Sequence, residues 1–592
     1  MYEANGKKGL ICQSPNETIL FKDENNVNQF LGLLKKNNFE SLKKLGDLMI
    51  IDKCYEKSIY FYENAIKLKN NNILIIAKIL SNLTENYIQY GYFTKALDCI
   101  NKSIDKIKIC FNNNKDEVDK KFILKSLLRK LRCFLGLRNF KEAYNFLALI
   151  RNNLKNYYKF DEKLLNEFLN INEVKNLIKI IGKGYENYLG KYNIKEMIND
   201  EKKMFNLNNG DYINPKLEIS FDSIKGIKII AKENIDKAEY IIVEKAIYIC
   251  RAHDPNNDFE TSNKININSY MISRIEYIDN INNLIKIIKK SPLDYKDFFI
   301  LYNGENLKLN YEERARILPD DLLSLLNIEL IENIFKFNKF CSLRYFSTLN
   351  KMGVGLWKYL SLFNHSCLPN TINLGIGDFI IVKANRQIKK GEEINLSYET
   401  NSKHYTRRKK LLKNIYNFEC DCSLCKIEKL NREKYPNILA QYDEFLDKLM
   451  NSDEINERMK IINNFASFLE KNKNILSENE LGKGYFELQC YSVDFLSANK
   501  FHNLANKYLK EIDIECVKLN INKFFDFCLM LKDYKQISLD NYNKVYKEEI
   551  EFNKSYYNFN EDEIKLLINV NLEEKNNEML IDFKQNLLCD KI

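Results

Sequence analysis

The chain has 592 residues, of which 45% are hydrophobic and 29% charged, a composition typical of a globular protein with more than one domain. Its net charge of +10 is spread over interleaved lysines and acids, so no basic block indicates direct nucleic-acid binding. The first ten residues, MYEANGKKGL, lack the apolar core of a signal peptide, and no apolar run approaches the roughly 20 residues of a membrane helix. We therefore expect no membrane contact, a cytoplasmic or nuclear location or both, and fifteen reduced cysteines.

After an N-terminal segment, residues 1–25, the chain is predicted to be helical over 26–205. Three stretches of this region resemble one another in the order of an aromatic, a small and an apolar residue: 55–66, 92–104 and 139–150. Their small residues are Ser58, Ala96 and Ala143, and Gly91 and Gly136 stand at the turns before the second and third copies. The pattern resembles tetratricopeptide (TPR) helical hairpins, with irregular spacing compared with the regular repeat of about 34 residues. The alternative is a helical bundle with coincidental similarity.

The pattern changes near Pro215, and residues 216–400 are predicted to form a β-rich domain with a helical insert at about 250–350. Short β-branched runs in the first part, broken at Gly226 and at a polar segment, indicate two or three strands. Strands return over 371–398, where KKGE indicates a turn. Residues 430–592 are again predicted to be helical. The expected fold class is therefore multidomain α+β, with all-α regions on both sides of the β-rich domain.

A basic helix is predicted over 404–418, with Arg407 and Arg408 on its exposed face. It runs into CDCSLC, the segment that holds Cys420, Cys422 and Cys425. Three thiolates so close together in a reduced chain indicate zinc, because unliganded thiols would oxidise easily. A structural zinc needs a fourth ligand, and the stretch SLFNHSCLPN supplies two candidates, His365 and Cys367.

Three blocks in this order resemble SET-domain protein lysine methyltransferases, and among them the SET-and-MYND (SMYD) group: LFNHSCLPN, GEEINLSY and RRKKLLKNIYNFECDCSLC. The resemblance covers about 216–426, and more loosely the helices on both sides. It implies a SET domain followed by a post-SET zinc site over 401–426. It also implies S-adenosylmethionine as cofactor, a structural zinc ion, and methyl transfer to a lysine of a histone or another protein.

The resemblance implies a role for each matching residue. Tyr398 would be the catalytic tyrosine at the methyl-transfer channel, and Tyr416 and Phe418 would line the channel for the substrate lysine. The cofactor would be bound by Lys225, Gly226, Ile227, Asn338, Asn364, His365, Tyr398 and Phe418. The zinc would be held by Cys367, Cys420, Cys422 and Cys425, so that Cys367 ties the cofactor wall to the post-SET segment.

Two positions and one module depart from the family pattern. Lys228 stands where a second glycine of the first cofactor block is expected, and Ala238 replaces the glycine of a turn. Between Glu244 and Phe340 the chain has one cysteine, Cys250, and one histidine, too few for a MYND zinc module. Partner binding that depends on that module is therefore not expected.

Two functions are compatible with these features. The first is protein lysine methylation, with a protein substrate and with a further protein partner on the TPR-like helices. The second is an inactive SET and TPR scaffold for protein–protein interaction, which the changes at Lys228 and Ala238 favour. Retention of Tyr398, Asn364 and His365 favours the enzyme. A nucleic-acid-binding zinc protein is disfavoured, because no basic stripe with spaced aromatic residues is present.

Overall fold

The structure is a computed structural model in which the chain forms two compact units, each described by itself. It describes residues 2–565 except for 5–6, 15–16, 22–23, 52, 69, 71, 114–117, 159, 161, 203–208, 251–262, 267–270, 291–294, 317–327, 343–352, 399–403, 453, 493–494, 511–520, 522–523, 526–527 and 529–536. Within these residues, no helix combines the length and the apolar character needed to cross a membrane.

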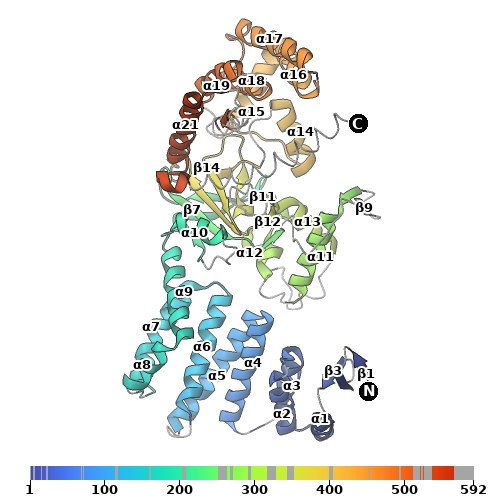
Figure 1. The fold of residues 1–592 in the computed structure, drawn as a ribbon, viewed down its shortest axis with the longest axis vertical. Helices are drawn as coiled ribbons and strands as arrows, with labels where there is room; N and C mark the ends of the chain where they lie inside the picture. The colour runs from blue at the N-terminus through green and yellow to red at the C-terminus, as the bar shows by residue number, and fades with distance from the viewer. Residues whose placement is uncertain are drawn as a thin grey trace. The chain divides into compact units, whose positions relative to one another are not determined.

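The first unit comprises residues 1–191, 208–210 and 286–296 and consists mainly of successive packed helices (Figure 1). An antiparallel sheet precedes them, with strands β1 (Tyr2–Ala4), β2 (Lys7–Ser14) and β3 (Glu17–Phe21). The helices are α1 (Glu24–Lys36), α2 (Phe39–Ile51), α3 (Tyr55–Lys67), α4 (Ile73–Tyr90), α5 (Phe93–Asn113), α6 (Lys120–Gly136), α7 (Phe140–Asn156), α8 (Glu162–Asn170) and α9 (Asn172–Tyr188).

The three similar stretches fall on α3, α5 and α7, each the second helix of a packed pair. Their small residues, Ser58, Ala96 and Ala143, are fully buried where helices touch. Close approach is needed at Gly136 as well, because a Cβ atom there would lie 2.1 Å from the ring of Phe93. The prediction of TPR-like helical hairpins is thus confirmed in its helices and in its small contact residues.

The second unit comprises residues 192–207, 211–285 and 297–592. Its strands are β4 (Tyr212–Ile213), β5 (Leu217–Asp222), β6 (Gly226–Ala231), β7 (Tyr240–Lys245), β8 (Tyr248–Cys250), β9 (Asn263–Asn266), β10 (Met271–Arg274), β11 (Phe340–Ser342), β12 (Gly353–Leu356), β13 (Asn364–His365), β14 (Thr371–Ile376), β15 (Phe379–Ala384) and β16 (Asn395–Leu396). The helices before β11 are α10 (Ile194–Lys202), α11 (Ile275–Lys290), the 3-10 turns η1 (Lys296–Ile300) and η2 (Asn306–Lys308), α12 (Tyr311–Arg316) and α13 (Ile328–Asn338), of which α11 belongs to this unit only up to residue 285 and η1 only from residue 297. After β12 come η3 (Leu360–Leu362), α14 (Tyr405–Tyr416), α15 (Ser423–Lys434), α16 (Pro436–Asn451), α17 (Ile455–Lys471), α18 (Glu478–Tyr491), α19 (Phe495–Leu509) and α21 (Leu539–Tyr557).

The central sheet of this unit is antiparallel in the order β14-β15-β7-β4, and both of its faces are buried. Alternate residues serve opposite faces, since Ile242 and Ile380 join one core with Trp357, whereas Val243 and Ile381 join another with the C-terminal helices. This arrangement explains why the strands read as nearly continuous apolar runs. Over the residues that the structure describes, the expected combination of a β-rich domain, a helical insert and flanking helical regions is confirmed, while the exact domain limits stay a prediction. Parts of the predicted insert, such as 251–262 and 317–327, and of the C-terminal region, such as 566–592, lie outside the described residues.

Lys383 connects this sheet to α21. Its ammonium donates a hydrogen bond of 2.8 Å to the carbonyl of Tyr557, the last residue of α21, and lies 4.5 Å from the ring centroids of Tyr240 and Phe559. Burial lowers the pKa of Lys383 to about 8. The contacts with a helix C-terminus and two ring faces therefore offset part of the cost of burying a lysine.

Ala238 adopts a left-handed backbone with φ +68°, in the turn before β7. Because L-residues avoid this region by about 1–2 kcal/mol, an Ala238→Gly variant is expected to gain roughly 0.5–1 kcal/mol in free energy of unfolding, measured by denaturant titration. Ala231→Gly is the matched control, because Ala231 lies in β6 outside the left-handed region and should lose a similar amount. Destabilisation by both changes would contradict the strain at Ala238.

Candidate functional site

Two of the sequence blocks lie side by side because their strands pair. β13 and β16 are parallel, with Asn364 opposite Asn395 and His365 opposite Leu396. The side-chain amide of Asn364 also donates to the carbonyl of Ile227, at 3.3 Å, and to the carboxylate of Glu393, at 2.9 Å. Three segments that are distant in sequence, at the starts of β6, β13 and β16, therefore meet at Asn364.

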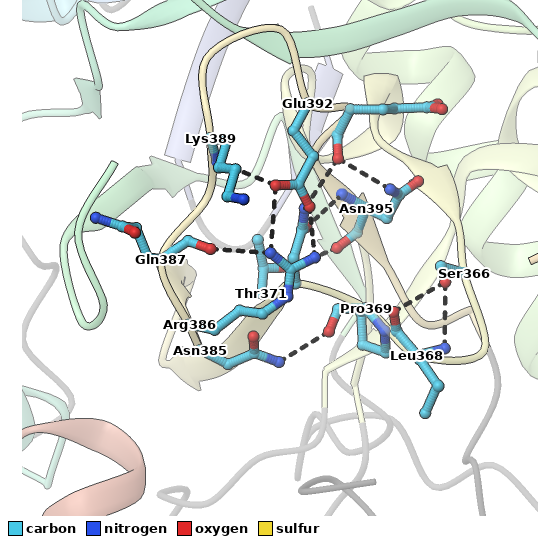
Figure 2. A network of polar contacts seen from close by, with 12 residues as sticks. Ser366, Leu368, Pro369, Thr371, Asn385, Arg386, Gln387, Lys389, Glu392 and Asn395 are labelled. Carbon is cyan, nitrogen blue, oxygen red and sulfur yellow. Dashed lines mark hydrogen bonds and ion pairs between the residues drawn. The ribbon is translucent and has the colours of Figure 1, made fainter. Parts of the chain in front are cut away.

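A polar network behind these strands fixes their connections (Figure 2). Asn370, which is buried, donates to the carbonyl of Glu393 at 2.8 Å and accepts from the amide of Asn395 at 2.9 Å. The Thr371 hydroxyl donates to the Asn395 carbonyl at 2.7 Å, and the Glu392 carboxylate accepts from Arg386. Asn370, the last residue of SLFNHSCLPN, thus holds the GEEIN segment in place through its side-chain hydrogen bonds.

Aromatic side chains from three segments surround Tyr398. Ring centroids lie 5.0 Å from Tyr398 for Tyr416, 5.3 Å for His365, 6.2 Å for Phe340 and 6.4 Å for Phe418. All five rings are half-buried, unlike the fully buried aromatic residues of the cores. Such a group presents ring faces and edges to a ligand, which suits a cationic or methylated one.

Both polar ends of Tyr398 are bound to the segment around β13. Its hydroxyl donates to the carbonyl of Phe363 at 2.6 Å, and its amide donates to Nδ1 of His365 at 3.0 Å. Burial, together with Tyr416 and Glu393, raises the pKa of Tyr398. The phenol is therefore neutral at physiological pH, and its oxygen keeps its lone pairs for a donor.

Four cysteines come together beside this group, with all four Sγ atoms of Cys367, Cys420, Cys422 and Cys425 within 4.8 Å of one another. Cys367 Sγ lies 3.6 Å from Cys425 Sγ and 3.9 Å from Cys420 Sγ. Tetrahedral zinc with bonds of about 2.3 Å separates its sulfurs by about 3.8 Å, so the donor set fits structural zinc. Of the two candidates for the fourth ligand, Cys367 belongs to the cluster, whereas His365 Nε2 contacts the Cys367 sulfur at 3.3 Å.

The block predicted to contact the cofactor, residues 225–227, lies at the tight turn between β5 and β6. Gly226 has φ +77°, and a Cβ atom there would lie 2.8 Å from Leu307, so the turn requires glycine. Lys225 is exposed, with its ammonium 3.5 Å from Asp421 and 3.8 Å from Glu393. Burial would lower the pKa of Lys225, but these two carboxylates outweigh it and raise the pKa.

The structure places one predicted cofactor residue, Asn338, and the departure from the family pattern at Lys228 as follows. Asn338 is buried, and its amide donates to the carbonyls of Tyr302 and Ile334, each at 2.7 Å. Its role toward a cofactor stays a prediction. Lys228, at the expected glycine position, lies in β6 opposite Ser220 and pairs with Asp222 at 3.6 Å. This position therefore needs no left-handed backbone, and the lysine side chain has a partner of its own.

The expectation that Arg407 and Arg408 are both exposed is wrong for Arg408. Arg407 is exposed and contacts Met450, but Arg408 is buried and forms an ion pair with buried Glu428 of α15. Asn479 of α18 donates to the other oxygen of Glu428, at 3.0 Å. Burial would lower the pKa of Arg408, but the carboxylate of Glu428 and the nearby thiolates of the cysteine cluster raise it.

Sequence reasoning missed Phe340, Glu393 and Glu428. Phe340 is one of 36 phenylalanines, and nothing in the sequence around Asn338 distinguishes it. Glu393 lies inside GEEINLSY, where Tyr398 is the residue with an expected role. The burial of Glu428 could not be predicted from the sequence, because nothing in a charged helix distinguishes a buried acid from the exposed acids around it.

The fold and these motifs define a SET domain, since residues 226–399 match the family described as SET domain. Within this part the chain is similar to histone-lysine N-methyltransferase SMYD3 of Mus musculus, 30% identical over 112 residues that make up 19% of this chain and 26% of that protein. Histone-lysine N-methyltransferase ASHR1 of Arabidopsis thaliana is 31% identical over 124 residues, again 19% of this chain and 26% of that protein. These findings confirm the resemblance to SET-domain, SMYD-like lysine methyltransferases, although the chain spans only about a quarter of the length of these relatives.

A solved structure, that of Rubisco LSMT bound to sinefungin and monomethyllysine, is 13% identical, with 61% of this chain and 89% of that chain covered. Its TM-score of 0.21 is too low to indicate a shared fold over that length.

Proposed function

We propose that this protein transfers a methyl group from S-adenosylmethionine to the side-chain nitrogen of a lysine in a protein substrate. The observation that carries the proposal is the half-buried aromatic group around Tyr398, next to the meeting point of three segments at Asn364 and to the four-cysteine cluster. Similarity to enzymes named histone-lysine N-methyltransferases supports the reaction, and histone and other proteins are both open as substrates.

In this proposal the residues of the first block, Asn364, His365 and Phe418 contact the cofactor, and Tyr416 and Phe418 line the lysine channel. S-adenosylmethionine supplies, when bound, an electrophilic methyl group on a sulfonium. The four cysteines hold zinc in a structural role, because four sulfur ligands leave no open position for chemistry.

The lysine amine must be neutral to attack. An unperturbed lysine has a pKa of about 10.4. Removal of the lysine from water and the positive charge of the neighbouring sulfonium both lower that pKa, so its proton is released to water. Because the Tyr398 hydroxyl donates to the Phe363 carbonyl, its oxygen is left to accept a hydrogen bond from the amine. That bond orients the nitrogen lone pair, and the rings exclude water, which supplies rate enhancement through alignment.

Calorimetric titration of the zinc-replete protein with S-adenosylmethionine tests the cofactor part. We expect saturable binding that Asn364→Ala loses, because this change removes the link to Ile227 and Glu393. Asn385→Ala is the matched control, because Asn385 also donates its amide to a backbone carbonyl, that of Pro369, and has no proposed contact with the cofactor. No binding at millimolar cofactor would overturn the proposal and leave the scaffold as the better interpretation.

Tyr398→Phe tests the reaction part. This variant keeps the ring and should keep the cofactor, while transfer of labelled methyl groups to protein lysine should fall about 100-fold in kcat. Unchanged kcat would contradict the proposed role of the hydroxyl.

The TPR-like helices are proposed to bind a protein partner, and a cytoplasmic or nuclear location stays a prediction.

A further inference from the structure

The side chain of His365 makes polar contacts with both Tyr398 and the cysteine cluster. Its Nδ1 accepts from the Tyr398 amide at 3.0 Å, and its Nε2 lies 3.3 Å from the sulfur of Cys367. A backbone amide can only donate, so Nδ1 carries no hydrogen in this contact. In the neutral imidazole the hydrogen is then on Nε2, which donates it to the Cys367 sulfur.

The position of His365 in the strand pair explains why Tyr398 needs this contact. The ladder between β13 and β16 ends with the Ser366 amide donating to the Leu396 carbonyl at 2.9 Å. Tyr398 lies two residues beyond β16. There its backbone amide donates a hydrogen bond to the His365 side chain, where a continued strand pair would offer a backbone carbonyl. Its hydroxyl bond to Phe363 is the second attachment. Placement of the tyrosine therefore depends on the orientation of one imidazole ring.

The orientation of that ring depends in turn on the sulfur. A zinc-bound thiolate carries negative charge and is stabilised by an N–H donor, and groups that hydrogen-bond a metal ligand typically change metal affinity by about 10–100-fold. The imidazole ring is also packed against Phe418, with centroids 5.9 Å apart, two residues before the first cysteine of CDCSLC. The contacts with Cys367 and with Phe418 therefore both hold the imidazole ring against the cysteine cluster and the segment before it.

We propose that the His365 side chain is a positioning residue that couples metal occupancy of the four-cysteine site to the placement of Tyr398. The inference rests on the proposed function only in what it says of catalysis. The two couplings, toward the sulfur and toward the tyrosine amide, are properties of this chain. A structural zinc then influences methyl transfer without taking part in it.

Two substitutions test the contacts of Nδ1 and Nε2 of His365 separately. In His365→Asn, the side-chain oxygen stands near the place of Nδ1, so it can still accept from the Tyr398 amide but cannot reach the sulfur. In His365→Gln, the terminal amide stands near the place of Nε2, so it can donate to the sulfur but not hold Tyr398. We expect His365→Asn to weaken zinc binding about 10–100-fold in competition with a chromophoric chelator, and to keep the Tyr398 amide protected from hydrogen exchange.

His365→Gln should show the reverse, with zinc affinity close to that of the parent protein and exchange of the Tyr398 amide accelerated about fivefold, as for loss of one hydrogen bond. His502→Gln is the matched control, because His502 also makes a polar contact through Nε2, with Glu548 at 3.2 Å in the C-terminal helices. It should change neither quantity.

The coupling would be supported if His365→Asn lost only zinc affinity and His365→Gln lost only the protection of the Tyr398 amide. Equal loss of both properties in both His365 variants, loss of either property in His502→Gln, or no change in either His365 variant would overturn it. Neither measurement needs methyl transfer, so failure of the proposed function is seen separately, as absent cofactor binding in the parent protein. Where transfer is measured, His365→Gln should lower kcat more than it raises KM for the protein substrate.

Discussion

A Cys367→Ala variant is expected to lose its stoichiometric zinc and most of its affinity for S-adenosylmethionine. Cys367 is fully buried, and its sulfur contacts two other cysteine sulfurs, so its removal leaves a structural zinc with three ligands. Structural zinc contributes roughly 10–16 kcal/mol of folding free energy in small zinc domains, and loss of one ligand should cost several kcal/mol. Metal content is measured by mass spectrometry, and cofactor affinity by calorimetry.

The loss of cofactor affinity follows from the position of Cys367 in the chain. It lies in the segment that carries Asn364 and His365, and the sulfur cluster fixes the end of that segment against α15. Cys528→Ala is the matched control, because Cys528 is another fully buried thiol, packed among the C-terminal helices. It should retain zinc and cofactor. Normal cofactor affinity in zinc-depleted Cys367→Ala would show that the two sites are independent.

The four-cysteine cluster and most of the aromatic group could be predicted from sequence, because each depends on side chains inside compact motifs. CDCSLC supplies three of the four thiols within six residues, and only the partner, Cys367, had to be found elsewhere. Tyr398 likewise closes a recognisable block. The helices and strands of the β-rich domain followed from hydrophobic periodicity, which depends only on local sequence.

The contacts that sequence reasoning missed join elements far apart in the chain. Asn370 fixes a segment more than twenty residues away, and its own motif does not say which partner it has. Phe340 reaches Tyr398 only because β11 is brought to the site by the fold. Arg408 lies beside exposed Arg407 in a helix so rich in lysine and arginine that its apolar stripe is short. Which arginine is buried is decided by Glu428, on another helix.

The buried pair of Arg408 and Glu428 is expected to be essential for the stability of this region. In Arg408→Met, the Glu428 carboxylate would be left buried without a cation, and breaking such a pair costs about 3–5 kcal/mol. Since α14 and α15 carry the residues on either side of the cysteine cluster, zinc affinity should fall as well. Denaturant unfolding and chelator competition measure the two effects.

Two further variants decide whether an unpaired charge is the cause. Arg407→Met makes the same replacement one residue earlier on the exposed face and should change stability by no more than about 0.5 kcal/mol. The double variant Arg408→Met/Glu428→Gln removes both charges but keeps an oxygen to accept from Asn479, so it should regain most of the loss. A double variant as unstable as Arg408→Met alone would show that the arginine acts through its packing volume and not by neutralising Glu428. In that case α18 would hold α14 and α15 through the shape of their packed side chains, and the hydrogen bond from Asn479 to Glu428 would contribute little.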